Sequence, residues 1–474
     1  MMPGPESVTS RSRARFAFAL AVVLAVSPSA WRAPAAQDDP AALIRAYWTE
    51  HDASARSALA RRLASLPECR PSRLREWLHR GVPFPDLSSG TRAITVDAGG
   101  GQTRRVVLVV PEGYRPDRAW PLIYALHPSG QPADEWAEQM RQMLGMRARE
   151  FLVASPEYVQ NYIAAKPPFI AEHAAILDAV ARQVHVDADR VYAFGYSKGG
   201  FAAWYVALYF PDRFAGAVSL AAGFDVAPGE DGFWKHLVAN VAHVPVLNAW
   251  GEFDPLVVKD LAGQPAGTFA ESNRWFAQAV RKMPLPIRNL EVSGGVHNQL
   301  APPGEPIVES LARRRVPDPP RVAHVFRHLH QASTYWIEGL SWIGDSWGDP
   351  WPPRAEAKPG ESEAATLART LEPLLGRLTG VREGQTLRVT KRHIGEIVVW
   401  FGERSVSWDA PVTIECDGKV VFTGRVKPDI ELALARAKAT MDFERLFFGG
   451  IRVDGSGAAS VVTAATMPEP AWRR

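Results

Sequence analysis

The sequence predicts an α/β fold: a mostly parallel sheet with helices on both faces, followed by a smaller, mainly antiparallel β domain. Three observations support this prediction. Between residues 91 and 312, short apolar runs typical of strands alternate with amphipathic stretches typical of helices. Beyond residue 316, a period-2 alternation of apolar and polar residues dominates instead. The composition fits a globular protein with a sizeable core, since 46% of the 474 residues are apolar and 22% are charged.

The first 36 residues have the pattern of a secretory signal peptide. Three arginines between residues 11 and 15 precede an apolar run over 16–26, and small residues follow at 33–36. The apolar run is short for a bilayer span, so we expect cleavage, no stable membrane span afterwards, and a secreted or periplasmic protein. An uncleaved membrane anchor is the alternative.

Charge and cysteine content exclude some classes of protein. The net charge is +3 with no long basic run beyond the N-terminus, which gives no electrostatic case for nucleic-acid binding. Cys69 and Cys416 are the only cysteines. They could form a disulfide or remain free thiols, and the fold does not depend on a disulfide framework.

Residues 37–90 are predicted to form an N-terminal helical extension, because apolar residues recur three and four positions apart with arginines between them. The next part, residues 91–316, is predicted to be the α/β domain that the functional motifs described below belong to. Its expected strands lie within 91–99, 104–114, 121–130, 151–158, 187–197, 214–223, 243–254 and 287–297. Its expected helices lie within 171–184, 201–210, 269–283 and 306–315.

A proline- and arginine-rich stretch, residues 313–321, marks the predicted boundary to a β-rich accessory domain over 317–474. The clearest signal there is a hairpin within 411–426 that turns through Asp417-Gly418. Further strands are expected within 386–390 and 396–401, and a helix within 429–439.

Two groups of side chains in this region suggest ligands but have a simpler explanation. The tryptophans could bind carbohydrate, although aromatic packing between the two domains is the favoured interpretation; they are Trp336, Trp342, Trp347 and Trp351. His324, His328 and His330 would share one face of a strand. No carboxylate or cysteine joins them, so we expect a sheet face and no metal site.

The segment 191–204, VYAFGYSKGGFAAW, places a serine between glycines where a strand turns into a helix. Val191–Phe194 is the expected strand, Gly195–Gly199 the turn and Phe201–Phe210 the helix. This order is the setting of a nucleophile elbow, in which a serine hydroxyl is raised above the sheet on strained backbone. The alternative is an ordinary turn serine.

A serine nucleophile needs a base and an acid, which are expected in loops after later strands in the order Ser, Asp, His. Asp254 follows the apolar strand that ends at Trp250-Gly251, with Glu252 as the competing carboxylate. His297 follows the next strand and its Ser293-Gly294-Gly295 turn. We therefore predict Ser197, Asp254 and His297 as the catalytic residues.

The oxyanion of an acyl-transfer intermediate needs two N–H donors. The amide of Lys198, the residue after the serine, is the first candidate. The second is expected in the turn His127-Pro128-Ser129-Gly130. Proline has no N–H, so the donor is Ser129 or Gly130, and His127 is expected to shape the turn.

With these motifs in hand, residues 91–312 resemble the α/β-hydrolase superfamily. Residues 184–218 are similar to the corresponding stretch of polyhydroxybutyrate-depolymerase-like, feruloyl-esterase-like and prolyl-oligopeptidase-like enzymes. The resemblance implies Ser197 as nucleophile, Asp254 as acid and His297 as base. These families commonly have glycine where this chain has Pro128, and a proline has no N–H to serve as the second oxyanion donor.

These expectations describe an exported serine hydrolase that cleaves a carboxylic ester through an acyl-enzyme. Its partner would be a small-molecule or polymeric ester, and it would need no metal or organic cofactor. Two alternatives stay open: a serine peptidase of the prolyl-oligopeptidase-like type, and an inert binding protein that has kept the hydrolase fold. The sequence does not decide the oligomeric state.

Overall fold

The computed structural model describes most of the chain after the predicted signal segment. It covers residues 39–99, 101–157, 167–223, 237–259, 265–300, 304–344, 356, 358–362, 365–366, 369–370 and 372–473. The predicted signal peptide and two of the four tryptophans, at positions 347 and 351, lie outside the described residues.

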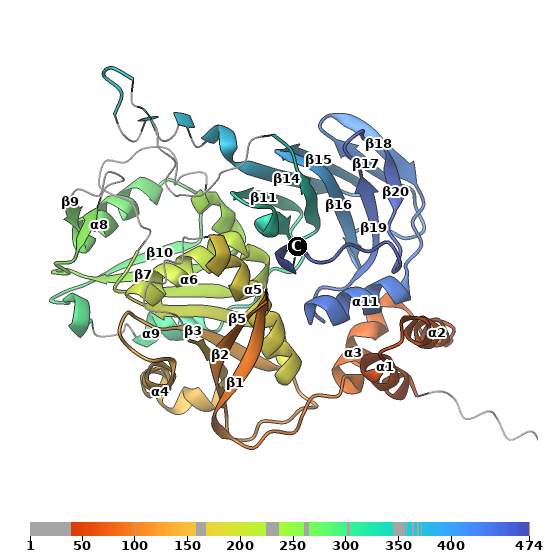
Figure 1. Ribbon diagram of the computed structural model, residues 1–474, viewed down its shortest axis with the longest axis horizontal. Coiled ribbons are helices and arrows are strands. Elements are labelled where there is room, and N and C mark those ends of the chain that lie inside the picture. Colours follow the sequence, from red (N-terminus) through yellow and green to blue (C-terminus); the bar gives the residue numbers. More distant parts are fainter. Residues whose placement is uncertain are drawn as a thin grey trace, which may run out of the picture. The chain divides into compact units, whose positions relative to one another are not determined.

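An eight-stranded sheet has the strand order β1-β2-β4-β3-β5-β6-β7-β10 (Figure 1). Its strands are β1 (Gly90–Gly99), β2 (Gln102–Val110), β3 (Trp120–Leu126), β4 (Leu152–Pro156), β5 (Val186–Tyr196), β6 (Gly216–Leu220), β7 (Val246–Gly251) and β10 (Ile287–Val292). The β1–β2 and β2–β4 pairs are antiparallel, whereas the pairs from β4 through β10 are parallel. The prediction of a mostly parallel sheet is confirmed.

Helices cover both faces of this sheet, as the alternation of β3 requires. Leu122, Tyr124 and Leu126 face one apolar core, and Ile123 and Ala125 face the other. Helices α5 (Pro167–Gln183), α6 (Lys198–Tyr209) and α8 (Phe269–Val280) pack into the first core; α4 (Ala133–Leu144) and α9 (Gly304–Ser310) pack into the second. A strand that is buried on both faces has a continuous apolar sequence, and β3, whose residues are all buried, has such a sequence.

Three helices form the N-terminal extension: α1 (Pro40–Thr49), α2 (Ala53–Ala64) and α3 (Pro71–Gly81). The carboxylates of Asp39 and Asp52 accept from the first amides of α1 and α2, so both helices are capped. The extension shares an apolar cluster with α11 (Ile430–Thr440), on which Lys438 donates to the Trp48 carbonyl at 2.7 Å.

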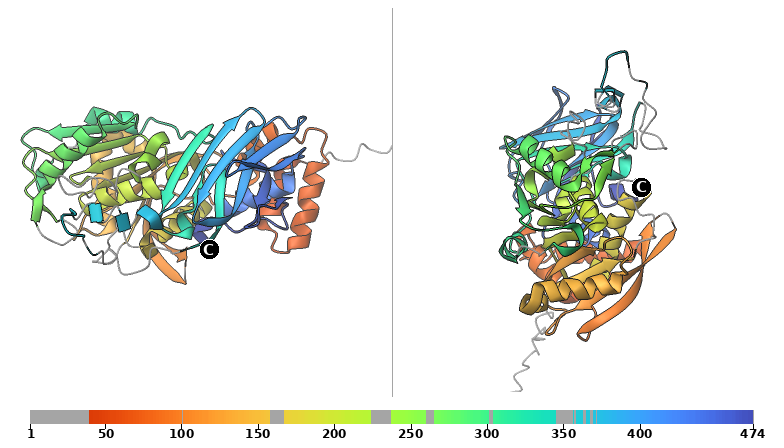
Figure 2. Two further views of the ribbon diagram at one scale, coloured as in Figure 1. Left: turned by 90° about the horizontal axis from the view of Figure 1, so that it is seen from above. Right: turned by 90° about the vertical axis from the view of Figure 1, so that its left-hand side faces the viewer.

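The C-terminal region contains two five-stranded sheets, whose strands run beside one another in Figures 1 and 2. One consists of β11 (Arg321–Phe326), β14 (Gly376–Glu383), β15 (Thr386–Arg392), β17 (Val412–Cys416) and β18 (Lys419–Gly424); the other consists of β12 (Ser333–Thr334), β13 (Ile337–Trp342), β16 (Ile394–Gly402), β19 (Phe447–Val453) and β20 (Ala459–Val461). All their pairs are antiparallel except β15–β17. The predicted hairpin is confirmed: Asp417 and Gly418 both have positive φ, at 51° and 78°.

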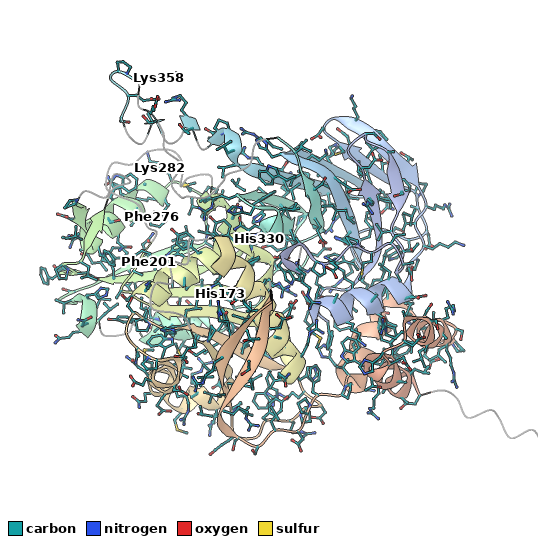
Figure 3. All side chains as sticks on the ribbon, in the orientation of Figure 1. His173, Phe201, Phe276, Lys282, His330 and Lys358 are labelled. Carbon is teal, nitrogen blue, oxygen red and sulfur yellow. The ribbon has the colours of Figure 1, made fainter. Side chains whose placement is uncertain are left out.

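Two expectations for this region were wrong. Trp336 does not pack between the two predicted domains, because it is buried in the core of the two C-terminal sheets. The three histidines do not share a strand face, because β11 ends at Phe326 and His328 lies in the turn beyond it. His324 bonds the Gln331 carbonyl at 2.8 Å, and the rings of His328 and His330 stack 5.4 Å apart (His330 is labelled in Figure 3).

Within the described ranges, no three side chains of His, Cys, Asp or Glu gather as metal ligands. In the same part of the chain, no helix has the length and apolarity that a bilayer crossing requires. Cys69 and Cys416 are both free thiols. The boundary between residues 316 and 317 stays a prediction, since the chain from Asp39 onward forms a single unit.

A buried ionic network joins the hydrolase-like part to the C-terminal sheets. Arg315 lies beyond α9 and donates to Asp189 at 2.9 Å and to Asp442 at 2.7 Å. Arg445 pairs with Asp212 at 2.8 Å. Burial alone would raise the pKa of Asp442, but the guanidinium groups of Arg315 and Arg445 outweigh it and hold the pKa below the usual range.

Replacing Asp442 by Asn is expected to lower the free energy of unfolding by about 1.5–3 kcal/mol, because the buried Arg315 loses one of its two carboxylate partners and keeps only Asp189. Urea denaturation measures this change. The control is Arg388→Gln, which breaks the exposed Arg388–Glu383 pair and should leave the midpoint nearly unchanged. Equal midpoints for wild type and Asp442→Asn would contradict the proposed importance of the network.

Stability is also expected to depend on four buried histidines. Burial lowers the pKa to about 3 for His173 and His330, and to about 4 for His185 and His324. The unfolded chain takes up these protons near pH ~6.5, whereas the folded form does not until about pH 4 or below. The contribution of these histidines to stability is therefore fully present above about pH 6.5 and is lost progressively as the pH falls from about 6.5 to about 4. The slope of the unfolding free energy against pH counts the protons taken up on unfolding, and in His324→Gln this number should be smaller by about one. Denaturation at several pH values between about 4 and 6.5 measures the slope. An unchanged slope would contradict this assignment.

Candidate active site

The turn between β5 and α6 consists of Ser197 alone. Strand β5 ends at Tyr196 and helix α6 begins at Lys198, so the helix starts three residues earlier than predicted. Ser197 has φ 51° and ψ −121°, a conformation that L-residues avoid and that a sharp strand-to-helix reversal requires. Its backbone N–H donates to the Leu220 carbonyl at 2.8 Å, which ties the turn to β6.

The glycines around the serine are required by close backbone contacts. A Cβ at Gly199 would lie 1.9 Å from the Leu126 carbonyl oxygen at the end of β3. A Cβ at Gly195 would lie 1.9 Å from the Gly199 carbonyl oxygen. Both distances are far inside van der Waals contact, so only glycine allows α6 to approach the sheet this closely.

Ser197, His297 and Asp254 form a continuous hydrogen-bonded series. Ser197 Oγ lies 2.8 Å from His297 Nε2, and His297 Nδ1 lies 2.8 Å from Asp254 Oδ2. A carboxylate only accepts, so Nδ1 carries the proton and Nε2 presents its lone pair to the serine hydroxyl. Asp254 is buried, and its other oxygen accepts from the Leu256 amide at 3.2 Å.

Glu252, the competing carboxylate, has a different partner. It accepts from the Gly294 amide at 2.9 Å and from the Ser293 hydroxyl at 2.9 Å. These two hydrogen bonds lower the pKa of Glu252. Glu252 therefore holds the turn that precedes His297, and Asp254 is the carboxylate that contacts the imidazole.

Tyr196 and Phe269 contact His297 and Phe201 packs against Phe269, and the sequence pattern assigned a role to none of the three. The Tyr196 hydroxyl donates to the His297 carbonyl oxygen. The Phe269 ring lies edge-on to the imidazole with centroids 5.7 Å apart, and Phe201 lies edge-on to Phe269 at 5.4 Å (Figure 3 labels Phe201). Tyr196 stands beside the serine in the motif, but no sequence signal indicates that its hydroxyl reaches a residue so distant along the chain.

The candidate oxyanion donors lie close to the serine. Lys198 is the first residue of α6, where amides point out of the helix toward its N-terminal end. The same helix turn touches the second candidate segment, since a Cβ at Gly199 would lie 2.9 Å from the His127 carbonyl oxygen. His127 Nδ1 donates to the Pro128 carbonyl at 2.9 Å, and burial lowers the pKa of His127. Ser129 lines the same cleft as Ser197.

A cleft of about 1010 Å³ opens beside Ser197 and His297. Helices α4 and α9 pack into the same core on one face of the sheet, and both contribute residues to the lining of this cleft. The apolar lining residues are Trp136, Met143, Leu144, Phe151, Tyr196, Leu256, Leu300, Ile307, Val308 and Leu311. Among its described lining residues there is no carboxylate, and the only guanidinium, that of Arg147, is paired with Glu150 at 2.9 Å.

The family model of the prolyl oligopeptidase family matches residues 170–231, which include the serine turn. Together with the strand order and the elbow, this match decides the fold. The chain has an α/β-hydrolase fold. Over 204 residues this chain is 29% identical to NocK of Nocardia uniformis subsp. tsuyamanensis, a protein whose naming as an esterase is itself provisional. The alignment covers 39% of this chain and 55% of NocK, so the chain spans about half the length of this relative.

Solved structures similar to this chain include two esterases and a depolymerase. A thermostable esterase is 21% identical with a TM-score of 0.37, covering 48% of this chain and 63% of that one. The feruloyl esterase module from Clostridium thermocellum is 16% identical with a TM-score of 0.37, covering 48% and 91%. The poly(3-hydroxybutyrate) depolymerase LpqC from Bordetella parapertussis is 18% identical with a TM-score of 0.36, covering 45% and 86%.

Proposed function

We propose that this protein is a serine hydrolase that cleaves carboxylic esters through an acyl-enzyme, with Ser197, His297 and Asp254 as a catalytic triad. The observation that carries the proposal is the unbroken series of two 2.8 Å contacts from Ser197 through His297 to Asp254. A strained serine at a helix N-terminus, beside an open cleft, supports the same function.

In the proposed mechanism, His297 Nε2 accepts the hydroxyl proton as Ser197 Oγ attacks the ester carbonyl carbon. Asp254 keeps the second imidazole proton on Nδ1 and stabilises the imidazolium that forms. His297 then protonates the leaving alcohol as the C–O bond breaks. Water attacks the acyl-enzyme by the same route, which releases the acid and restores Ser197.

The tetrahedral intermediate carries a negative oxygen that needs two N–H donors. We assign the Lys198 amide as the first donor and the amide of Ser129 or Gly130 as the second. The partial positive charge at the start of α6 favours the same oxygen. All of these donors belong to the backbone, so the side chain of Lys198 is not required for this role.

The family model favours a second candidate, a serine peptidase that uses the same three residues. The two activities separate in one comparison, the turnover of short p-nitrophenyl esters against that of aminoacyl nitroanilides. Labelling by a fluorophosphonate probe distinguishes both from an inert hydrolase-fold protein, because an inert fold would not react. From the pattern of residues 1–36 we further propose that the hydrolysis takes place outside the cytoplasm, in the periplasm or the medium.

Ser197→Ala is expected to lower kcat on p-nitrophenyl esters by about 10⁴-fold or more, because the attacking oxygen is lost. It should also abolish fluorophosphonate labelling while the protein remains folded by circular dichroism. A variant that kept a tenth of wild-type turnover would remove Ser197 from the role of nucleophile.

Asp254→Asn is expected to lower kcat by about 10⁴-fold, because the imidazole loses the acceptor that fixes its tautomer. Glu252→Gln is the matched control from the same loop and should retain kcat within about tenfold, because Glu252 holds a turn and does not contact His297. Steady-state kinetics on one ester measures both variants. A larger loss in Glu252→Gln than in Asp254→Asn would reverse the assignment of the acid.

A further inference from the structure

The segment that leads to His297 contains two adjacent glycines, so the position of the imidazole depends on the contacts that its backbone makes. Gly294 has φ 70°, and Gly295 follows it. Glu252 accepts from the Gly294 amide at 2.9 Å, and the Phe253 amide donates to the Gly295 carbonyl at 2.9 Å. Both bonds lie before His297 in the chain, so they do not fix the peptide group of the base itself.

The hydroxyl of Tyr196 makes a contact with that peptide group. It donates to the carbonyl oxygen of His297, 101 residues further along the chain. Tyr196 is the last residue of β5, and Ser197 follows it directly. One hydrogen bond therefore joins the backbone of the base to the strand end that carries the nucleophile. Burial raises the pKa of Tyr196, so the phenol keeps its proton and remains a donor at neutral pH.

The ring of Tyr196 packs between two other rings, which gives its hydroxyl a defined position. Its centroid lies 6.2 Å from that of Trp136 on α4 and 6.2 Å from that of the His297 imidazole. Trp136 is fully buried in the core beneath the cleft. Tyr196 also belongs to the cleft lining, but its hydroxyl is directed at a backbone carbonyl. We therefore expect the hydroxyl to act through His297 and not through the substrate.

We propose that Tyr196 is a positioning residue, whose hydroxyl holds His297 within hydrogen-bonding distance of Ser197 while the base moves the proton. The inference rests on the proposed serine-hydrolase function. The imidazole must contact Ser197 on one side and Asp254 on the other, both at 2.8 Å. A displacement of about 1 Å in a reacting group can cost about 100-fold in rate. A hydrogen bond to the backbone of the base limits such a displacement and leaves both ring nitrogens available.

Tyr196→Phe tests the proposal, because it keeps the ring and removes only the hydroxyl. We expect kcat on a p-nitrophenyl ester to fall by about 10- to 100-fold, with KM changed by less than about twofold. The rate constant of fluorophosphonate labelling should fall by a similar factor, since the probe also needs an activated Ser197. Labelling gives this readout for an esterase and for a peptidase alike.

Tyr192→Phe is the matched control. Tyr192 packs into the same core from the same strand, and its hydroxyl donates to the Arg313 carbonyl at 2.6 Å. This variant also loses a phenol-to-carbonyl hydrogen bond, but the bond does not involve a residue of the proposed triad. It should keep the wild-type kcat and labelling rate within about twofold. Urea denaturation of both variants checks that each is folded under the assay conditions.

A double-mutant cycle separates positioning of the base from a general disturbance of the site. In His297→Ala, the residual turnover comes from the oxyanion donors and from substrate binding. Adding Tyr196→Phe to this background should cause no further loss, because the residue through which the hydroxyl acts has lost its imidazole. A general structural role would lower the rate by the same factor in both backgrounds.

Wild-type kcat in Tyr196→Phe would overturn the proposal, as would an equal loss with and without the imidazole. A loss confined to KM would also overturn it and would make Tyr196 a substrate-binding residue. A wild type that neither hydrolysed the ester nor reacted with the probe would overturn the proposed function and this inference with it. An active wild type that Tyr196→Phe equalled would overturn the inference alone.

Discussion

The close approach of α6 to the end of β3 is the constraint on which the site depends. The helix can start one residue after Ser197 only because Gly199 leaves room for the Leu126 carbonyl oxygen. That contact forces the serine into its unusual backbone conformation and raises its hydroxyl toward His297. It also brings the start of α6 against the turn after β3, where the second oxyanion donor is expected. One pair of backbones in contact thus determines where the nucleophile and both candidate donor segments lie.

The loop after β7 shows how one short segment serves several roles. Glu252 fixes the turn that leads into His297, Phe253 faces solvent, and Asp254 is buried against the imidazole. Adjacent side chains in a tight loop point in different directions, so one can hold a turn while the next faces solvent or contacts the imidazole. The identity of each residue follows from what its own side chain faces.

The parts of the fold that depend on local signals could be predicted from the sequence. The strand-to-helix turn indicated Ser197 as a candidate, and the ends of later strands indicated Asp254 and His297, because parallel strands deliver their ends to one edge of the sheet. The structure brings these three candidates into contact. The predicted start of α6 was wrong. Glycine has a low helix propensity, which argued against a helix over Gly199 and Gly200, whereas the contact with the sheet permits one there. The placement of His328 failed because the chain turns after Phe326. Tyr196 and Phe269 could not be assigned roles, since their contacts to His297 arise only once distant segments pack together.

The Arg315 network has a consequence for how this chain could have been assembled in evolution. Asp189 and Asp212 come from the hydrolase-like part, whereas Asp442 and Arg445 come from the last part of the chain. A fragment cut after the hydrolase helices would keep the two acids and lose Arg445, and the mirror fragment would keep Asp442 without Arg315. Each half would keep one ion pair, Arg315–Asp189 in one and Arg445–Asp442 in the other, and both would lose the pairs that cross between them, so a fusion of two once-independent modules would have gained those crossing pairs only after the two were joined.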